Sequence, residues 1–165
     1  MSETDRMVEN AEHYRSVFEP GPPTPAPARK VAVVACMDAR LDLFGILGLT
    51  PGDAHVIRNA GGVATDDVIR SLVISQRKLG TREIVLVHHT DCGMLTFKDE
   101  ELGAKLRAAT GVLPIAPARF YAFADLDENV RDQVGRIRAH PWLPKGIPVR
   151  GFVYDVRTGR LREVK

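Results

Sequence analysis

The sequence predicts a single-domain α/β fold with a central, mostly parallel β-sheet flanked by helices. The 165 residues match the usual size of one domain. Continuous apolar, β-branched runs alternate with segments of helical periodicity, as in strands joined by crossover helices. The composition, 44% hydrophobic and 27% charged, is typical of a globular chain that buries its core without disulfides.

The N-terminal part of the chain predicts a helix followed by a stiff linker. Apolar residues recur at near-helical spacing over Asp5–Phe18. In Pro20–Pro27 five of eight residues are proline, which excludes a helix or a central strand and favours an extended segment. We therefore expect residues 1–29 to form an N-terminal arm and residues 30–165 to form the α/β domain.

Three buried strands and one helix are predicted in the next part of the chain. Val31–Cys36 reads VAVVAC, the continuous apolar run of a strand that is buried on both faces. Ala54–Arg58 and Glu83–His88 are the second and third strand candidates. Between these two we expect a glycine turn at Asn59–Gly62 and then a helix. Its expected N-cap is Thr65, its stop signal is Gly80, and its apolar face is Val68, Ile69, Leu72, Val73 and Leu79.

The C-terminal third predicts one more helix and two strands. Gly103–Pro117 is rich in glycine and proline, and we expect it to be broken, irregular chain. Apolar spacing predicts a helix over Asp125–His140, which ends before Pro141. Pro148–Val156 reads as a last long strand, and a turn at Thr158 and Gly159 would bring Leu161–Val164 back beside it.

Charge and hydropathy exclude several classes of partner. The formal net charge is only +2 and the basic residues are scattered, which argues against nucleic acid or an anionic membrane surface. The longest apolar runs have seven residues, far below the roughly 20 that a membrane helix needs. The N-terminus is polar and does not resemble a signal peptide. We therefore expect a soluble, cytoplasmic protein.

Chemistry-bearing residues follow two of the predicted strands. Cys36 ends the first strand in C-M-D-A-R, and His89 and Cys92 follow the third in H-H-T-D-C-G. Since the carboxyl ends of parallel strands meet at one edge of a sheet, these three side chains can converge there. Two cysteines and a histidine suit zinc, and three protein ligands leave one tetrahedral position open, as in catalytic sites.

Each of these signals alone has a plainer explanation. Two free cysteines are most often simply buried, and His88 competes with His89 for the histidine position. Asp38 and Arg40 stand two residues apart just after a strand, and in most proteins such a pair is an ordinary surface ion pair. The Arg58–Gly62 segment, R-N-A-G-G, lacks the spacing of a dinucleotide or phosphate loop, and its plainer interpretation is a tight turn before a helix.

Taken in order, C-x-D-x-R, R-N-A-G-G and H-x-x-C-G resemble the β-class carbonic anhydrases over about Val31–Gly93. The resemblance implies one zinc ion per chain, bound by Cys36, His89 and Cys92. It also implies a catalytic dyad of Asp38 and Arg40, with Asp38 able to occupy the fourth zinc position in a closed, inactive state. The chain departs from the family pattern where some members carry a regulatory bicarbonate site, because Val33 stands at the position of its tryptophan.

The resemblance implies a zinc lyase that converts CO2 and water to bicarbonate and a proton through attack of zinc-bound hydroxide. Zinc chemistry supports this, because the metal lowers the pKa of its water. Apolar Val63 and Phe97 would suit a small nonpolar substrate. A homodimer or a dimer of dimers is also implied, with the N-terminal helix reaching across to a partner.

Two alternatives stay open. Similar proteins hydrolyse carbonyl sulfide or carbon disulfide on the same fold. The other alternative is a non-enzymatic module whose zinc only braces the fold or whose sheet edge binds a nucleotide. The open coordination position beside Asp38 and Arg40 and the missing phosphate loop argue against that module.

Overall fold

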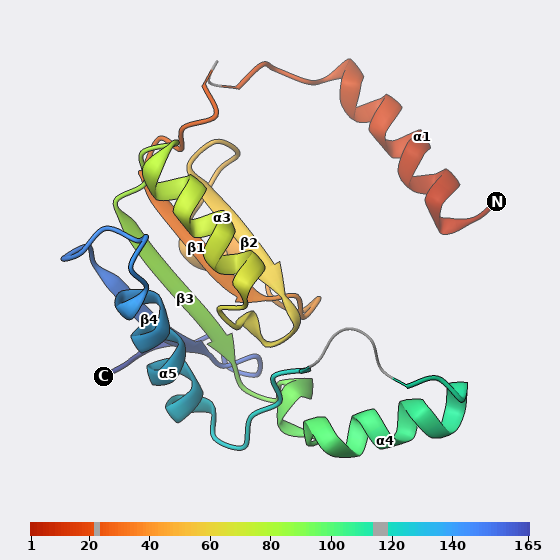
Figure 1. Cartoon of the computed structure of the whole chain (residues 1–165). Coiled ribbons are helices and arrows are strands. Elements are labelled where there is room, and N and C mark those ends of the chain that lie inside the picture. The colour runs from red at the N-terminus through yellow and green to blue at the C-terminus, as the bar shows by residue number, and fades with distance from the viewer. Residues whose placement is uncertain (22–23, 114–118) are drawn as a thin grey trace.

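A five-stranded β-sheet in the order β2-β1-β3-β4-β5 forms the centre of the computed structural model, which describes residues 1–21, 24–113 and 119–165 (Figure 1). The first four strands pair in parallel, and β5 runs antiparallel to β4. The predicted fold class is confirmed, and the hairpin predicted around Thr158 and Gly159 forms β4 and β5. The strands are β1 (Val31–Cys36), β2 (Ala54–Asn59), β3 (Glu83–His89), β4 (Val149–Tyr154) and β5 (Leu161–Val164).

Two helices cover one face of the sheet, α3 (Asp66–Arg77) and α5 (Leu126–Ala139). Thr65 caps α3 as predicted, and Asp125 caps α5: the side chain of each accepts a hydrogen bond from a backbone N–H group in the first turn of its helix. The main core lies here, where buried side chains of both helices contact those of the strands. Its helical members are Val68, Ile69, Leu72, Val130, Val134 and Ile137.

The opposite face of the sheet is covered by short elements and loops. Within β1, Ala32 and Val34 belong to the core under the helices, whereas Val33 and Ala35 belong to this second core. Burial on both faces is the reason why β1 reads as an uninterrupted apolar run. The cover comes from helix α2 (Leu43–Leu47), the 3-10 turn η2 (Gly93–Leu95) and the segment that contains Ala122 and Phe123.

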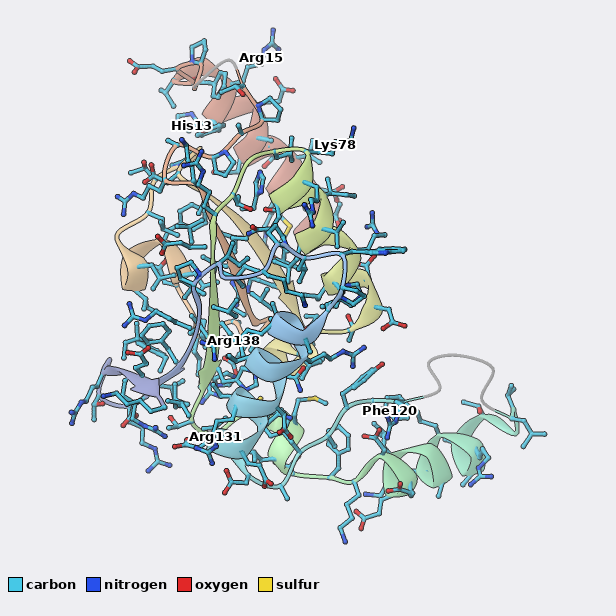
Figure 2. All side chains as sticks on the ribbon, turned by 60° about the vertical axis from the view of Figure 1, so that its left-hand side comes forward. His13, Arg15, Lys78, Phe120, Arg131 and Arg138 are labelled. Atoms are coloured by element: carbon cyan, nitrogen blue, oxygen red, sulfur yellow. The ribbon has the colours of Figure 1, made fainter. Side chains whose placement is uncertain are left out.

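Two further helices, α1 (Glu3–Ser16) and α4 (Asp99–Thr110), extend from this body (Figure 1). Every residue of α1 is exposed, and α4 buries none of its twelve described residues. Figure 2 places His13 and Arg15 of α1 at the opposite end of the molecule from Phe120, which lies beside α4. The predicted N-terminal helix is confirmed and begins two residues earlier than expected, because Ser2 caps it.

Helix α4 corrects the expectation that Gly103–Pro117 is broken chain. The helix runs through Gly103 and ends at Gly111, which adopts the left-handed conformation of a C-terminal cap. A glycine inside a helix costs only about 1 kcal/mol, and three acidic residues in the first turn favour this one. Residues 114–117 of that expected segment, and residues 22–23 of the linker, lie outside the described part of the chain.

The strand register brings the chemistry-bearing residues to one edge of the sheet. Ala35 of β1 pairs with Val87 of β3, so that Cys36 and the loop after His89 leave the sheet side by side. In the described residues, the helices are too short or too polar for any of them to span a bilayer.

Candidate metal centre

Three potential metal ligands come together at the carboxyl edge of the sheet. The sulfur atoms of Cys36 and Cys92 and a ring nitrogen of His89 all lie within 4.8 Å of one another. All three residues are buried, between 0 and 4% exposed. Cys36 is the last residue of β1, His89 is the last residue of β3, and Cys92 follows after a two-residue turn. The parallel register of β1 and β3 therefore builds the cluster from residues more than fifty positions apart.

The local hydrogen bonds favour a thiolate at Cys36. The Cys92 thiol, above all, and also His89 and the backbone N–H groups of Asp38 and Gly61, interact with the Cys36 sulfur. Against the opposing effect of burial, these neighbouring groups lower the pKa of Cys36 to about 4. The same hydrogen bond and burial raise the pKa of Cys92. Because metals bind the thiolate form, Cys36 is prepared for a metal and Cys92 would lose its proton on binding one.

His89 is held with one nitrogen directed into the cluster. Its Nδ1 donates to the carbonyl oxygen of Thr90 at 2.9 Å, and this bond orients the ring. Its buried Nε2 has no hydrogen-bond partner within the described residues. Burial acts to lower the pKa of His89, but the neighbouring Cys36 sulfur and its negative charge contribute most to raising it above its ordinary value. A buried nitrogen without a hydrogen-bond partner, within 4.8 Å of two sulfur atoms, completes a donor set that suits zinc.

His88 lies outside this cluster. Its Nε2 faces the carbonyl oxygen of Gly62 at 3.3 Å, and its ring stacks on Phe123 with the ring centroids 5.6 Å apart. Burial is the main reason why its pKa falls to about 4. His88 is therefore a neutral core residue, and of the two histidines only His89 reaches the cysteines.

Asp38 and Arg40 form a close pair beside the cluster. Arg40 Nε donates to Asp38 Oδ1 at 2.9 Å and Arg40 Nη2 donates to Asp38 Oδ2 at 2.7 Å. The side-chain hydrogen bonds from Arg40 are the main reason why the pKa of Asp38 lies well below its usual range. Asp38 Oδ2 lies 3.7 Å from His89 Nε2, so an ionised carboxylate borders the cluster.

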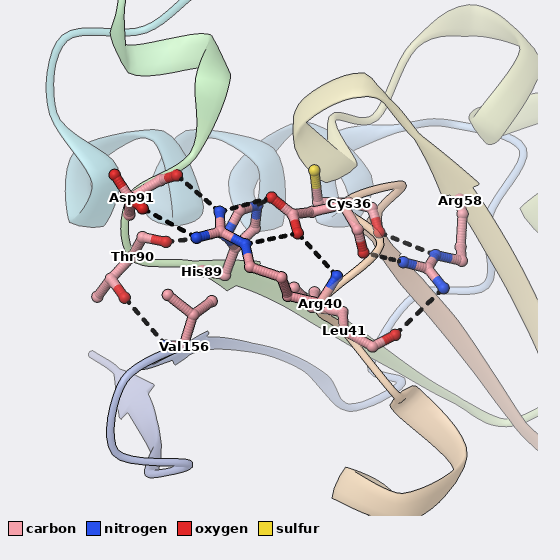
Figure 3. A network of polar contacts seen from close by, with 9 residues as sticks. Cys36, Arg40, Leu41, Arg58, His89, Thr90, Asp91 and Val156 are labelled. Carbon is pink, nitrogen blue, oxygen red and sulfur yellow. Dashed lines mark hydrogen bonds and ion pairs between the residues drawn. The ribbon is translucent and has the colours of Figure 1, made fainter.

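Arg58 is a residue of this site to which the sequence analysis assigned no role beyond a turn. Its guanidinium donates to three carbonyl oxygens of the loop after β1, those of Cys36, Asp38 and Leu41 (Figure 3). Arg58 stands on β2, next to the strand that carries the loop. The position of R-N-A-G-G before the helix was the available signal, but only the strand order places its arginine against this loop.

The glycine turn after Arg58 also supports the cluster. Gly62 has a φ of +67°, and a Cβ atom at this position would lie 2.8 Å from the backbone nitrogen of Cys36. Only glycine permits both this conformation and this close approach. Asn59 closes the turn through hydrogen bonds to both the carbonyl oxygen and the N–H of Val63.

The apolar residues expected near a substrate lie in two different cavities. Val63 lines one of about 380 Å³, together with Ala60 and Tyr121. Phe97 lines another of about 570 Å³ between η2 and the start of α4. Val63 itself is only 2% exposed. The two side chains therefore do not form a single substrate surface within this chain.

Comparison with known proteins decides the family. A family model described as carbonic anhydrase matches residues 31–161. The chain belongs to the carbonic anhydrase family. It is 52% identical over 164 residues to β-carbonic anhydrase 1 of Mycobacterium tuberculosis (strain ATCC 25618 / H37Rv), covering 99% of both proteins. The β-class resemblance expected from the motifs is thereby confirmed.

Solved structures and a second group of relatives complete the comparison. The structure of a carbonic anhydrase from Streptococcus mutans is 44% identical, with a TM-score of 0.93 over 100% of this chain and 99% of that one. Carbon disulfide hydrolase of Acidianus sp. (strain A1-3) is 40% identical, and the match covers 82% of this chain and 77% of the hydrolase. The chain is therefore similar both to proteins named as carbonic anhydrases and to one named as a carbon disulfide hydrolase.

Proposed function

We propose that this chain catalyses the reversible hydration of CO2 to bicarbonate and a proton, with a zinc ion bound by Cys36, His89 and Cys92. The observation that carries the proposal is the convergence of two sulfur atoms and the unpartnered Nε2 of His89 within 4.8 Å. Three soft or borderline donors fit zinc and leave a fourth tetrahedral position. A zinc ion bound there would lower the pKa of a water molecule and supply the nucleophile that CO2 requires near neutral pH.

The roles of Asp38 and Arg40 follow from their position. The Asp38 carboxylate is ionised, borders the cluster and can accept a hydrogen bond from a water molecule there. Accepting that bond orients the remaining lone pairs of the water toward the substrate. Arg40 binds both carboxylate oxygens of Asp38 and so restrains the carboxylate from becoming a fourth zinc ligand. Asp38 and Arg40 are therefore the proposed catalytic residues.

Coverage favours CO2 over carbon disulfide as the substrate. The chain spans 99% of the mycobacterial β-carbonic anhydrase but 77% of the carbon disulfide hydrolase from Acidianus. About a quarter of the hydrolase sequence therefore has no counterpart in the match to this protein. Carbonyl sulfide and carbon disulfide stay the alternative substrates, since the same nucleophile attacks all three. Turnover measured in parallel on CO2 and carbon disulfide separates the two activities.

We further propose a homodimer or a dimer of dimers in which residues 1–29 form a dimerisation arm on the catalytic domain, residues 30–165. The 14 residues of α1 are all exposed, including Met7 at 69% and Tyr14 at 56%. Isolated helices of about this length are only marginally stable in water, so α1 needs a surface to pack on. A partner subunit would supply that surface. The cytoplasmic location expected from the sequence stays a prediction.

The test is stopped-flow CO2 hydration by metal-quantified protein beside Cys92→Ser and Met94→Leu. We expect wild-type protein to bind about one zinc per chain and to hydrate CO2 rapidly, and Cys92→Ser to lose both, because a serine hydroxyl is a poor zinc ligand. Met94 is a buried sulfur-containing residue two positions away, and its similar-sized replacement should retain both properties. Zinc-loaded wild-type protein that hydrates no CO2 would contradict the proposal.

A further inference from the structure

The guanidinium of Arg40 lies between two carboxylates from two different loops (Figure 3). In addition to its two bonds to Asp38, it donates from Nη1 to Asp91 Oδ2 at 2.9 Å. Its Nη2 also donates to the backbone oxygen of Asp91 at 3.0 Å. The side chain of Asp91 therefore binds Nη1, the guanidinium nitrogen that makes no bond to Asp38. This contact joins residues 51 positions apart in the sequence.

Asp91 lies in the two-residue turn that joins two of the proposed zinc ligands. It stands between His89 and Cys92 and has a φ of +58°. Few residues other than glycine adopt this left-handed conformation, although aspartate and asparagine tolerate it best. The conformation directs both the carbonyl and the carboxylate of Asp91 to Arg40. One short loop thus combines metal ligands with an anchor for the arginine of the dyad.

The Asp91 contacts act on the carboxylate oxygen nearest to the cluster. Asp38 Oδ2 lies 3.7 Å from His89 Nε2, and it accepts its hydrogen bond from Arg40 Nη2. The same Nη2 donates to the backbone of Asp91, and the adjacent Nη1 donates to the Asp91 side chain. Because the guanidinium is rigid and planar, the bonds to Asp91 determine its orientation and hence the place of Asp38 Oδ2.

Stability alone does not account for this arrangement. The side chain of Arg40 is 46% exposed and that of Asp91 is 63% exposed. Ion pairs between such exposed groups contribute little to folding. Removing the Asp91 side chain should therefore leave the fold and the three ligands in place, and it should change the orientation of Arg40.

We propose that Asp91 is a positioning residue for the reaction, which acts through Arg40 to keep Asp38 in hydrogen-bonding reach of the metal centre without ligating the metal. The inference rests on the proposed function for its effect on turnover. Without the anchor, Arg40 gains freedom to turn toward solvent. Asp38 would then be free to act as a fourth ligand of a zinc ion held by the other three residues, because a carboxylate oxygen is a competent zinc ligand.

Two substitutions separate the side chain of Asp91 from its backbone conformation. Asp91→Gly retains the left-handed conformation and the backbone acceptor but removes the carboxylate. Asp91→Asn retains the conformation and one acceptor oxygen and removes only the charge. The matched control is Lys30→Gly, because Lys30 has a similar φ of +55° and precedes β1 at the opposite edge of the sheet.

The variants are compared as zinc enzymes and as cobalt(II)-substituted enzymes, whose visible spectrum reports the ligands of the metal. We expect Asp91→Gly to bind one metal per chain but to lose about tenfold in kcat/KM for CO2, a loss typical of outer-shell changes. Its cobalt spectrum should shift as a carboxylate enters the fourth position. Asp91→Asn should recover most of the activity and the wild-type spectrum, and Lys30→Gly should match wild type in both.

A double variant tests whether Asp91 acts through Arg40. In an Arg40→Ala background, the added Asp91→Gly substitution should change neither turnover nor spectrum further, because the residue that it positions is gone. Wild-type turnover and spectrum in Asp91→Gly would overturn the inference, as would an equal loss in both backgrounds. Should the wild-type protein bind cobalt and hydrate no CO2, the proposed function fails, and the cobalt spectra still decide the role of Asp91.

Discussion

Helices α3 and α5 bury apolar side chains against the sheet, whereas α1 and α4 bury none of theirs. In α3 and α5, residues such as Leu72 and Ile137 are 0% exposed and pack on the sheet. In α1 and α4, residues such as Tyr14 and Leu106 are 56% and 44% exposed. All four helices have caps or charged first turns that favour a helix. Helix formation and helix packing are therefore decided separately in this protein, the first by local sequence and the second by the surface available.

The largest expected difference between the packed helices, α3 and α5, and the exposed helices, α1 and α4, is in how much a core substitution lowers the free energy of unfolding. We expect Leu72→Ala in α3 to lower the free energy of unfolding by about 2–5 kcal/mol, because it leaves a cavity in the main core. The matched substitution Leu106→Ala in α4 should change it by less than about 0.5 kcal/mol. Urea denaturation followed by circular dichroism measures both. Similar losses in the two variants would show that α4 packs on a surface after all.

The second prediction concerns assembly, and it tests whether α1 packs on a partner. Met7 and Tyr14 lie seven residues apart and so share one face of the helix. Placing charges there with Met7→Glu and Tyr14→Glu should weaken the proposed dimer at least about tenfold in Kd, equivalent to about 1.4 kcal/mol. Sedimentation velocity over a range of concentrations measures it. The control is Glu9→Gln, which changes a residue on another face of α1 to a neutral one of similar size. An unchanged association constant in the double variant would count against the dimerisation arm.

The smallest effect is expected at the attachment of α4 to the body. The carboxylate of Asp99 accepts backbone hydrogen bonds from Phe120, Tyr121 and Ala122. Burial acts to raise the pKa of Asp99, but these bonds together lower it below its ordinary value. A carboxyl group whose pKa is lower in the folded state stabilises the protein above its unfolded pKa, near 3.9, and this contribution disappears as the pH falls through the folded pKa.

We therefore expect Asp99→Asn to cost about 1 kcal/mol at neutral pH. The difference from wild type should begin to shrink below about pH 4 and disappear as the pH falls through the folded pKa of Asp99. Urea denaturation at pH 6 and pH 3 measures the two differences. Asp132→Asn, at an exposed position of α5, is the control and should change stability little. A difference that is equal at both pH values would show that the charge of Asp99 contributes nothing.

Local patterns predicted the body of the fold, including the ends of β1 and the cap residue of α3. Their failure at α4 has a physical reason. Gly103 was read as a chain breaker, yet the acidic first turn and the cap at Gly111 outweigh the cost of one glycine within a helix. Sequence periodicity alone also does not predict that α4 buries none of its residues against the sheet.

The sequence predicted the three candidate ligands of the metal centre, but not the residues that support them. Cys36, His89 and Cys92 follow predicted strands, and the rule that parallel strands end at one edge was enough to bring them together. Successive side chains of a strand point to opposite faces, and His88 and His89 accordingly lie in different surroundings. Arg58 and Asp91 were not assigned their roles, because their partners are carbonyl or guanidinium groups of another loop. No spacing within the sequence records such contacts.

The sequence by itself determined the α/β class, the family and the three candidate metal ligands, because each depends on local periodicity or on motifs read in order. Only the tertiary structure decided which atoms meet. It turned His89 Nε2 into the cluster, placed Asp38 at its border and joined Arg40 to Asp91. These contacts depend on strand order and loop conformation, which are set by the packing of the whole sheet rather than by any one segment.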